Sequence, residues 1–365
     1  MNKNNKLPFF FNDKPIFGMD IGHTSLKVMQ SSFGDPKNRS KKPRVMGYGA
    51  TSFDGSAIKD GVIVKPEIIA DAALKMFSEK LVGDITTNRC AIAIPAYRIF
   101  TRYLKLPKLK VNEIAEATRL EVEQYIPIPL EDLYLDYEVT LNTNDSTEVF
   151  FVAVPKDIIN SYLELSSVMG IEPLLIEPTL SSSGRLFSFD KNNNIPSVII
   201  DFGSKSSDMS IFVDRILATG TVESGGDTFT EKISKALNLN LVEAKIVKNK
   251  YGLGVSKKQK EITEALEPVL NEIIKELQRI IRYYEEQTSA KNASIKQIVT
   301  LGGGANMPGL NDYLTSNLRL PVRHSDPWQY FEFNKLKIPS EVDKPMYATV
   351  AGLSIIKPKG IFNYA

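Results

Sequence analysis

Cysteine is nearly absent from the 365-residue sequence, which contains only Cys90. An intramolecular disulfide is therefore excluded, and the apolar run at 90–94 predicts a small buried thiol. A chain of this length with 42% hydrophobic residues has enough apolar material to fold without covalent cross-links. This composition fits a reducing cytoplasm.

Long hydrophobic runs and an excess of one charge are also missing. No segment approaches the ~20 apolar residues of a membrane helix, and the amino terminus lacks the pattern of a cleaved signal peptide. The 45 basic and 43 acidic residues leave a formal net charge of +2, far from the strongly basic balance of a dedicated nucleic-acid-binding protein. We therefore predict a cytoplasmic protein that does not bind nucleic acid.

The first residues contain a short apolar and cationic segment, Phe9-Phe10-Phe11, flanked by lysines. Such a segment is able to touch an anionic membrane surface, but three aromatic rings bury too little area for stable anchoring. We predict a flexible leader over residues 1–15. Histidine is scarce as well, and two histidines without further soft ligands do not predict a metal site.

Hydrophobic periodicity predicts an alternation of strands and helices. The expected strands lie near 16–19, 25–31, 91–95, 133–141, 149–154, 196–202, 209–213, 216–222 and 296–301, and the expected helices over 67–81, 112–124, 157–169, 225–237, 242–251 and 262–287. Pro127 and Pro129 end the second of these helices, because proline lacks the amide proton. We expect the last, long helix to pack within the molecule rather than form a coiled-coil seam.

Two strand-turn-strand segments share one pattern. The first reads Asp20-Ile21-Gly22-His23-Thr24-Ser25-Leu26-Lys27, and the second reads Asp201-Phe202-Gly203-Ser204-Lys205-Ser206-Ser207. Each has an acid at a strand end, a glycine that allows a tight turn, and hydroxyls that donate to phosphate oxygens. The acid suits a Mg²⁺ ion held through water. One such turn alone is more often an ordinary Asx turn, whereas two in the same context predict a phosphate site.

A glycine run follows the last expected strand and reads Gly302-Gly303-Gly304-Ala305-Asn306. Glycines at this place let the backbone approach a flat base or a phosphate. The chain thus contains an acid-glycine turn, an insert, a second acid-glycine turn and a glycine-rich strand end, in that order. This order resembles the superfamily of actin, sugar kinases and heat-shock chaperone ATPases.

The resemblance implies an α/β, actin-like (ribonuclease H-like, duplicated) two-lobed ATPase fold with an inserted small α+β subdomain. The first lobe is expected to comprise 16–95 with 170–190 and 343–356, the inserted subdomain 96–169, and the second lobe 191–342 with a helical subdomain at about 231–293.

The resemblance also implies a site for ATP and Mg²⁺ between the lobes. The residues expected to bind nucleotide are Asp20, Gly22, His23, Thr24, Ser25, Lys27, Asp201, Gly203, Ser204, Ser207, Gly225, Gly226, Lys248, Gly302, Gly303, Gly304 and Asn306. Asp20 and Asp201 would hold the metal through water, and Lys27 would face the phosphates. Two positions depart from the superfamily pattern: His23 replaces a serine, and Lys245 replaces an acid near the ribose.

Within this superfamily, the segment at 16–353 resembles the PilM family of type IV pilus assembly proteins, relatives of the division protein FtsA. The most specific stretch is 120–137, with its Ile-Pro-Ile-Pro helix stop, supported by 106–107 and 225–230. In such proteins the inserted subdomain forms one side of a groove for the extended cytoplasmic amino terminus of PilN.

The PilM resemblance implies partners and a location for the chain. The partners are a PilN-like tail, the pilus assembly motor ATPase and the assembly platform. Membrane association is indirect, so the chain is expected to be cytoplasmic and peripheral to the inner membrane. Self-association stays open.

The role of one residue and two other functional hypotheses stay open. Glu177 lies where superfamily members place a water-orienting group, but an acid beside Pro178 at a helix start is an equally good reading. Slow or absent ATP hydrolysis is therefore expected. An FtsA-like filament protein is the second functional hypothesis, and a small-molecule kinase, which needs a general base in the cleft, is the third.

Overall fold

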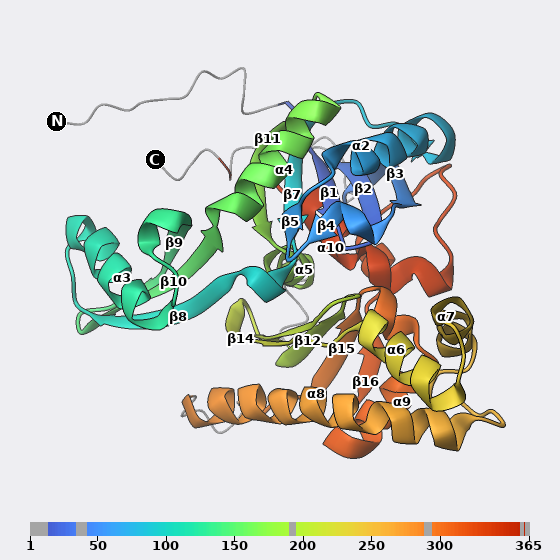
Figure 1. The fold of residues 1–365 in the computed structure, drawn as a ribbon. Coiled ribbons are helices and arrows are strands. Elements are labelled where there is room, and N and C mark those ends of the chain that lie inside the picture. Colours follow the sequence, from blue (N-terminus) through green and yellow to red (C-terminus); the bar gives the residue numbers. More distant parts are fainter. Residues whose placement is uncertain (1–13, 34–41, 190–194, 288–293, 358–360, 362–365) are drawn as a thin grey trace.

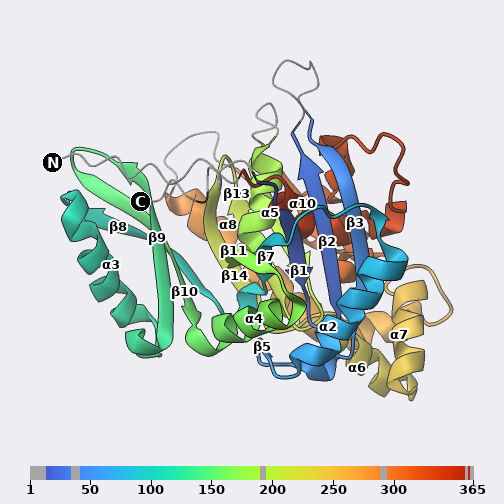
Figure 2. The same ribbon diagram turned by 90° about the horizontal axis from the view of Figure 1, so that it is seen from above.

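The computed structural model describes residues 14–33, 42–189, 195–287, 294–357 and 361. Two α/β lobes stack on each other, and the inserted subdomain stands at one side of them (Figure 1, Figure 2). No helix among these residues is long and apolar enough to cross a membrane. The expected leader lies mostly outside the described residues.

The first lobe is built on a six-stranded sheet in the order β11-β7-β1-β2-β3-β6. Its strands are β1 Phe17–Ile21, β2 Ser25–Ser32, β3 Arg44–Ser52, β6 Val82–Gly83, β7 Arg89–Ile94 and β11 Glu172–Pro178. The strands β1, β2 and β3 are antiparallel, whereas β7 runs parallel to β1. Helix α2 Pro66–Lys75 packs on one face, and α5 Thr179–Ser188 and α10 Ala348–Ser354 contact the sheet from the other side (Figure 1).

The second lobe repeats this arrangement in a five-stranded sheet, β14-β13-β12-β15-β16. Its strands are β12 Ser197–Phe202, β13 Ser207–Phe212, β14 Ile216–Val222, β15 Gln297–Leu301 and β16 Val322–His324, and its helices are α6 Gly226–Leu237, α7 Leu241–Lys250, α8 Gln259–Gln287 and α9 Leu310–Leu318. Again three strands are antiparallel and the next runs parallel to the first. The repeated turn pattern therefore reflects a repeated sheet.

Helix α8 buries its apolar stripe against the second sheet, with Leu266, Leu270, Ile273 and Leu277 fully inaccessible. The prediction that this helix packs within the molecule is confirmed. Burying such leucine and isoleucine side chains stabilises the lobe by roughly 1.5–3 kcal/mol each relative to leaving them exposed.

The inserted subdomain has a three-stranded antiparallel sheet, β8-β10-β9, covered by one helix. Its elements are β8 Phe100–Pro107, α3 Val111–Tyr125, β9 Leu133–Asn142 and β10 Ser146–Pro155. Helix α3 ends where Pro127 and Pro129 were expected to stop it. The following helix, α4 Lys156–Met169, ends at Gly170 with a left-handed φ of 67° and packs Ile158, Tyr162 and Leu165 on the first lobe.

Several elements were not predicted from the sequence. They include β3, β8, β11 and α10. In β3 the glycines Gly47 and Gly49 interrupt the apolar alternation; the strand approaches the Asp84 backbone too closely for a side chain at Gly47, and the Met76 side chain lies tightly against Gly49. Glu177 lies at the end of β11, and helix α5 begins two residues later.

Candidate functional site

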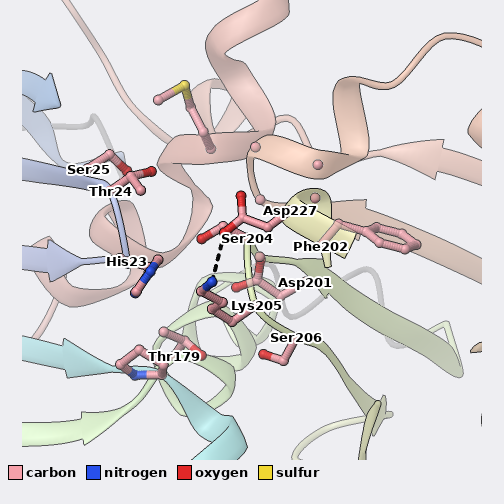
Figure 3. Close-up of a pocket in the computed structure, with 18 of the residues that line it drawn as sticks. His23, Thr24, Ser25, Thr179, Asp201, Phe202, Ser204, Lys205, Ser206 and Asp227 are labelled. Carbon is pink, nitrogen blue, oxygen red and sulfur yellow. Dashed lines mark ion pairs between the residues drawn. The ribbon is translucent and has the colours of Figure 1, made fainter. Parts of the chain in front are cut away.

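A cavity of about 430 Å³ lies between the two lobes. We call it the interlobe cavity (Figure 3). The predicted nucleotide-binding residues that line it are Asp20, Gly22, His23, Thr24, Ser25, Lys27, Asp201, Gly203, Ser204, Gly226, Lys248, Gly302, Gly303, Gly304 and Asn306. Ser207, Gly225 and Glu177 are not among its lining residues. The structure thus gathers residues from three distant parts of the sequence around one space.

The two acid-glycine turns have the same backbone geometry. In the first hairpin (β1–β2), the Gly22 amide donates to the Ser25 carbonyl at 2.9 Å; in the second hairpin (β12–β13), the Gly203 amide donates to the Ser206 carbonyl at 3.0 Å. Each turn projects from its own lobe into the cavity, so His23 and Thr24 face the side where Asp201 and Ser204 lie (Figure 3). Such turns present short runs of amides to a shared ligand.

The first hairpin carries a buried ion pair. Asp20 lies directly opposite Lys27 in the β1–β2 register, and Lys27 Nζ lies 3.0 Å from Asp20 Oδ2. The same ammonium donates to Ser25 Oγ at 3.3 Å. Both charged side chains are about nine-tenths buried, so each offsets the desolvation of the other.

The second hairpin carries a second carboxylate at the matching place. Asp208 lies opposite Asp201, and its carboxylate accepts from Ser206 Oγ at 2.8 Å and Thr221 Oγ1 at 2.7 Å. Burial, together with the charges of Asp208 and Asp20, raises the pKa of Asp201 to about 7. Burial also raises the pKa of Asp208 to about 6, although its hydroxyl donors oppose the shift. The sequence analysis missed Asp208.

The glycine run closes the cavity beside Asp201. Gly302 has a φ of 83°, and a Cβ there would sit 2.2 Å from Asp201 Oδ1. Only glycine fits this position, since the backbone is left-handed and the carboxylate leaves no room. Nothing lies within 4 Å of the place a Gly303 Cβ would take, so its backbone is open to an incoming group.

The start of helix α6 is fixed to the second hairpin. The Gly226 amide donates to the Gly203 carbonyl and the Asp227 amide to the Ser204 carbonyl, both at 2.9 Å. A Cβ on Gly225 would clash with this hairpin at 2.6 Å from the Gly203 oxygen, so Gly225 has a packing role behind the cavity. The positive end of the α6 dipole therefore adjoins the turn that carries Asp201.

Lysines from helix α7 and from the turn of the second hairpin line one wall of the interlobe cavity. Lys248 is 8% exposed, its Nζ donates to the Gly226 carbonyl at 2.6 Å, and burial lowers its pKa to about 8. Lys205 forms an ion pair with Asp227 at 3.2 Å (Figure 3). Lys245, which replaces an acid of the superfamily pattern, also lines the cavity. This wall suits an anionic ligand.

His23 is half-buried at the tip of the first hairpin. Burial and the nearby Lys205 charge lower its pKa, although Asp227 raises it in part. The ring is therefore neutral at pH 7 and has one N–H to donate. The replacement of a serine by histidine keeps a donor at this tip.

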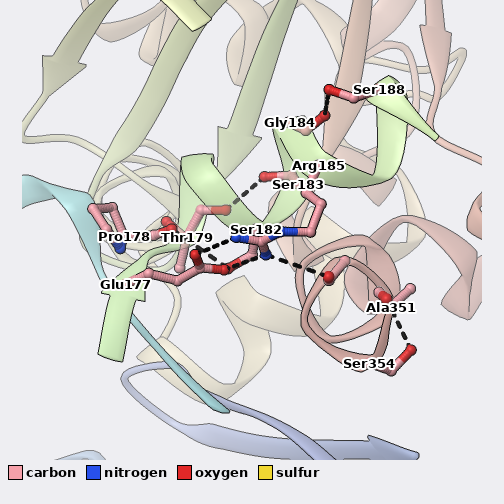
Figure 4. Close-up of polar contacts among 11 residues, drawn as sticks. Glu177, Pro178, Thr179, Ser182, Ser183, Gly184, Arg185, Ser188, Ala351 and Ser354 are labelled. Carbon is pink, nitrogen blue, oxygen red and sulfur yellow. Dashed lines mark hydrogen bonds and ion pairs between the residues drawn. The ribbon is translucent and has the colours of Figure 1, made fainter. Parts of the chain in front are cut away.

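The geometry does not support a catalytic role for Glu177. Its two carboxylate oxygens accept from the Arg185 guanidinium at 2.5 and 2.6 Å, and Ser182 Oγ adds a hydrogen bond of 2.7 Å (Figure 4). This carboxylate is engaged inside the first lobe, between β11 and α5, whereas Thr179 reaches the cavity. The sequence offered no sign of the arginine partner, eight residues away.

The oxygen-rich side of the cavity suits a hydrated Mg²⁺ ion. Asp20, Asp201 and Asp208 all line it, and carboxylate oxygens bind Mg²⁺ through its water shell. Within the described ranges, no group of three or more His, Cys, Asp or Glu side chains is close enough to enclose a metal directly. The residues therefore fit a water-mediated ion that arrives with phosphates.

Comparison with solved structures shows the fold. A "PilM-PilN type IV pilus biogenesis complex" has a chain similar to this one, with a TM-score of 0.79 and 24% identity over 95% of this chain and 99% of that one. MreB5 of Spiroplasma citri bound to ADP is similar with a TM-score of 0.52 and 14% identity, over 96% and 99% of the two chains. The fold is the actin-like, two-lobed α/β ATPase fold expected from the sequence.

Two curated cell division proteins FtsA are also similar. The protein from Enterococcus faecalis is 23% identical over 95% of this chain and 83% of its own length. The protein from Neisseria meningitidis serogroup B is 24% identical over 65% of this chain, and the match spans 58% of its length. The family model described as "Type IV pilus assembly protein PilM" matches residues 18–357. The chain belongs to this PilM family, as the resemblance of its sequence indicated.

Proposed function

We propose that this chain is an ATP-binding scaffold of type IV pilus assembly. It binds Mg-ATP in the interlobe cavity and the amino-terminal tail of a PilN-like inner-membrane protein on the inserted subdomain. The observation that carries the proposal is the convergence of both hairpins and the glycine run on one cavity, in a chain of the PilM family.

The arrangement of the cavity suggests how the nucleotide lies. The phosphates fit between the turns of the two hairpins, where backbone amides, hydroxyls and Lys27 are available to donate. Bound Mg²⁺ would supply charge neutralisation of the phosphates, and Asp20 and Asp201 would orient its water shell. The adenosine fits beside Gly302–Asn306. The similarity to an ADP-bound MreB5 supports a nucleotide at this cleft.

The partner proposal rests on the similarity to a PilM–PilN complex. An extended tail is captured by backbone pairing and side-chain pockets, and the inserted subdomain offers an open sheet edge at β9 for this. Binding such a tail would hold the chain at the cytoplasmic face of the inner membrane and connect it with the assembly motor and platform. We propose slow or absent hydrolysis, because Glu177 is engaged by Arg185.

The nucleotide site is tested with Asp20→Asn, which removes the metal-orienting charge but keeps an oxygen acceptor for Lys27. A nucleotide at 100 times its Kd stabilises the folded chain by about 2.7 kcal/mol. We expect Mg-ATP to raise the melting temperature of the wild type and of the control Asp71→Asn, which lies exposed on α2. Equal increases in melting temperature in Asp20→Asn and wild type would show that Asp20 is not part of the nucleotide site.

The partner site is tested with a peptide that copies the amino terminus of a PilN-like protein from the same genome. Calorimetric titration into the full chain, with and without Mg-ATP, should give saturable binding. A peptide of the same composition in scrambled order is the control. If neither condition gives binding above the scrambled peptide, the partner proposal is wrong.

A further inference from the structure

The inserted subdomain touches both lobes. Its chain enters from β7 and leaves through α4 and β11, so it is continuous with the first lobe only. Across the cleft, however, Thr101 of β8 contacts Thr219 of β14, with 3.1 Å between their hydroxyl oxygens, and Glu148 of β10 lies 3.9 Å from the Arg215 guanidinium. The subdomain therefore bridges the two lobes (Figure 1).

The bridge joins the outermost strands of two sheets. Strand β14 is the last strand of the second lobe's sheet, and β8 is an outer strand of the subdomain's sheet. They meet through side chains, since no β-ladder joins them. Such a contact covers two otherwise open edges and permits sliding, which a ladder of backbone hydrogen bonds would resist.

A second cavity of about 280 Å³ lies at this bridge, and we call it the side cavity. Its rim carries Arg102, whose guanidinium lies 4.0 Å from the centre of the Tyr125 ring. Thr101 and Tyr125 line it from the subdomain, and Thr219 and Thr221 line it from β14. Any relative movement of β8 and β14 changes its shape.

One hydrogen bond joins the linings of the two cavities. Thr221 lines the side cavity and donates to Asp208, which lines the interlobe cavity. Thr219 lies two residues before Thr221 on the same strand, so both side chains are on one face of β14. On this face of β14, Thr221 thus contacts Asp208 of the second hairpin and Thr219 contacts the inserted subdomain.

We propose that β14 couples the interlobe cavity to the inserted subdomain. The inference rests on the proposed binding of nucleotide in the first and of a partner tail on the second. Closure of the lobes around a nucleotide carries β14 with the second lobe while β8 stays with the first. The contact of Thr219 with Thr101 then shifts, and the side cavity with it. Because coupling is reciprocal, a tail that prefers one shape changes nucleotide affinity by the same factor.

Hydrogen–deuterium exchange with Mg-ATP tests the coupling without any partner. In the wild type, saturating Mg-ATP should change amide exchange in the second hairpin and also in β8 and β10. In Thr219→Val the change in the hairpin should persist and the change in β8 and β10 should disappear. The matched control is Thr140→Val, whose hydroxyl bonds only within the subdomain sheet, to the Glu148 carbonyl; it should behave as wild type.

A titration with the tail peptide measures the size of the coupling. We expect saturating peptide to change the Kd for Mg-ATP by about five-fold or more in wild type and Thr140→Val, and by less than about two-fold in Thr219→Val. Nucleotide binding with no exchange change in β8 and β10, and with a Kd independent of peptide, overturns the coupling and leaves the proposed function standing. A chain that binds neither ligand overturns both.

Discussion

The two hairpins have the same turn geometry but differ in the charged residue that lies opposite the acid. In the first, the acid at the end of β1 faces Lys27; in the second, the acid at the end of β12 faces Asp208. The buried charges of the first hairpin therefore neutralise each other. The second holds two carboxylates, partly buried Asp201 and buried Asp208, whose pKa values are raised to about 7 and about 6. The second hairpin accordingly needs a proton or a cation, and the first does not.

Removing Lys27 should leave the first hairpin with an uncompensated carboxylate, as in the second, and should have the largest effect on stability. Lys27→Ala leaves Asp20 buried without its partner, and breaking one side of a buried pair costs about 3–5 kcal/mol. Urea denaturation of the variant should show this loss. Lys75→Ala, at an exposed position on α2, is the control and should change stability by less than about 0.5 kcal/mol. A loss as small for Lys27→Ala would mean that the pair is not buried in solution.

Gly302→Ala tests the packing around Asp201. A non-glycine residue at φ 83° is strained, and its Cβ would meet the Asp201 carboxylate. We expect a loss of about 1–3 kcal/mol by denaturation, together with weaker Mg-ATP binding. Gly303→Ala, where the Cβ meets open space, is the stability control. Similar unfolding curves for the two variants would contradict the close approach at 302.

Asp208→Asn should remove one of the two negative charges that face each other in the second hairpin. The amide keeps polar contacts with Ser206 and Thr221 but removes a charge that raises the pKa of Asp201. We expect carboxyl-carbon NMR to report a lower Asp201 pKa, and the stability without ligand at pH 8 to rise by about 1 kcal/mol. Asp71→Asn should leave both quantities unchanged. A higher pKa for Asp201 in the Asp208→Asn variant would contradict this account.

The stability of the ligand-free chain should also depend on pH through the same two carboxyls. The folded-state pKa values of Asp201 and Asp208 lie above the value of 3.8 for an unperturbed carboxyl. The folded chain thus holds these protons more tightly, and the stabilisation is full below pH 3.8 and lost as pH rises through 6 and 7. Between pH 5 and 8 we expect the ligand-free chain to lose stability as both carboxyls ionise, while Mg-ATP affinity increases. Asp208→Asn should flatten both trends; identical profiles would contradict the assignment.

The repeated design was predictable from sequence because both hairpins keep the Asp-x-Gly turn. The bounds of strands β12 and β14 were also predicted to within one residue. Strand β3 was missed, because its glycines serve close packing and erase the alternation. Asp208 was missed although it follows Asp201 by seven residues, the same spacing as Lys27 after Asp20. The significance of this spacing follows only from the strand register, which places the two residues of each pair opposite each other.

Other features depend on contacts between distant segments, which no local pattern encodes. Glu177 looked like a catalytic candidate from its position, and only the fold places the Arg185 guanidinium against it. The bridge between Thr101 and Thr219 joins residues 118 positions apart. Lys245 was recognised as unusual, but its place on the cavity wall follows from the packing of α7 beside α6.

A crystal structure of the full chain with Mg²⁺ and a non-hydrolysable ATP analogue tests the central claim most directly. The account predicts phosphates between the Gly22 and Gly203 turns, and a hydrated Mg²⁺ on the Asp201 side of the cavity. A nucleotide that contacts one hairpin only, or density for it outside the interlobe cavity, would contradict the account.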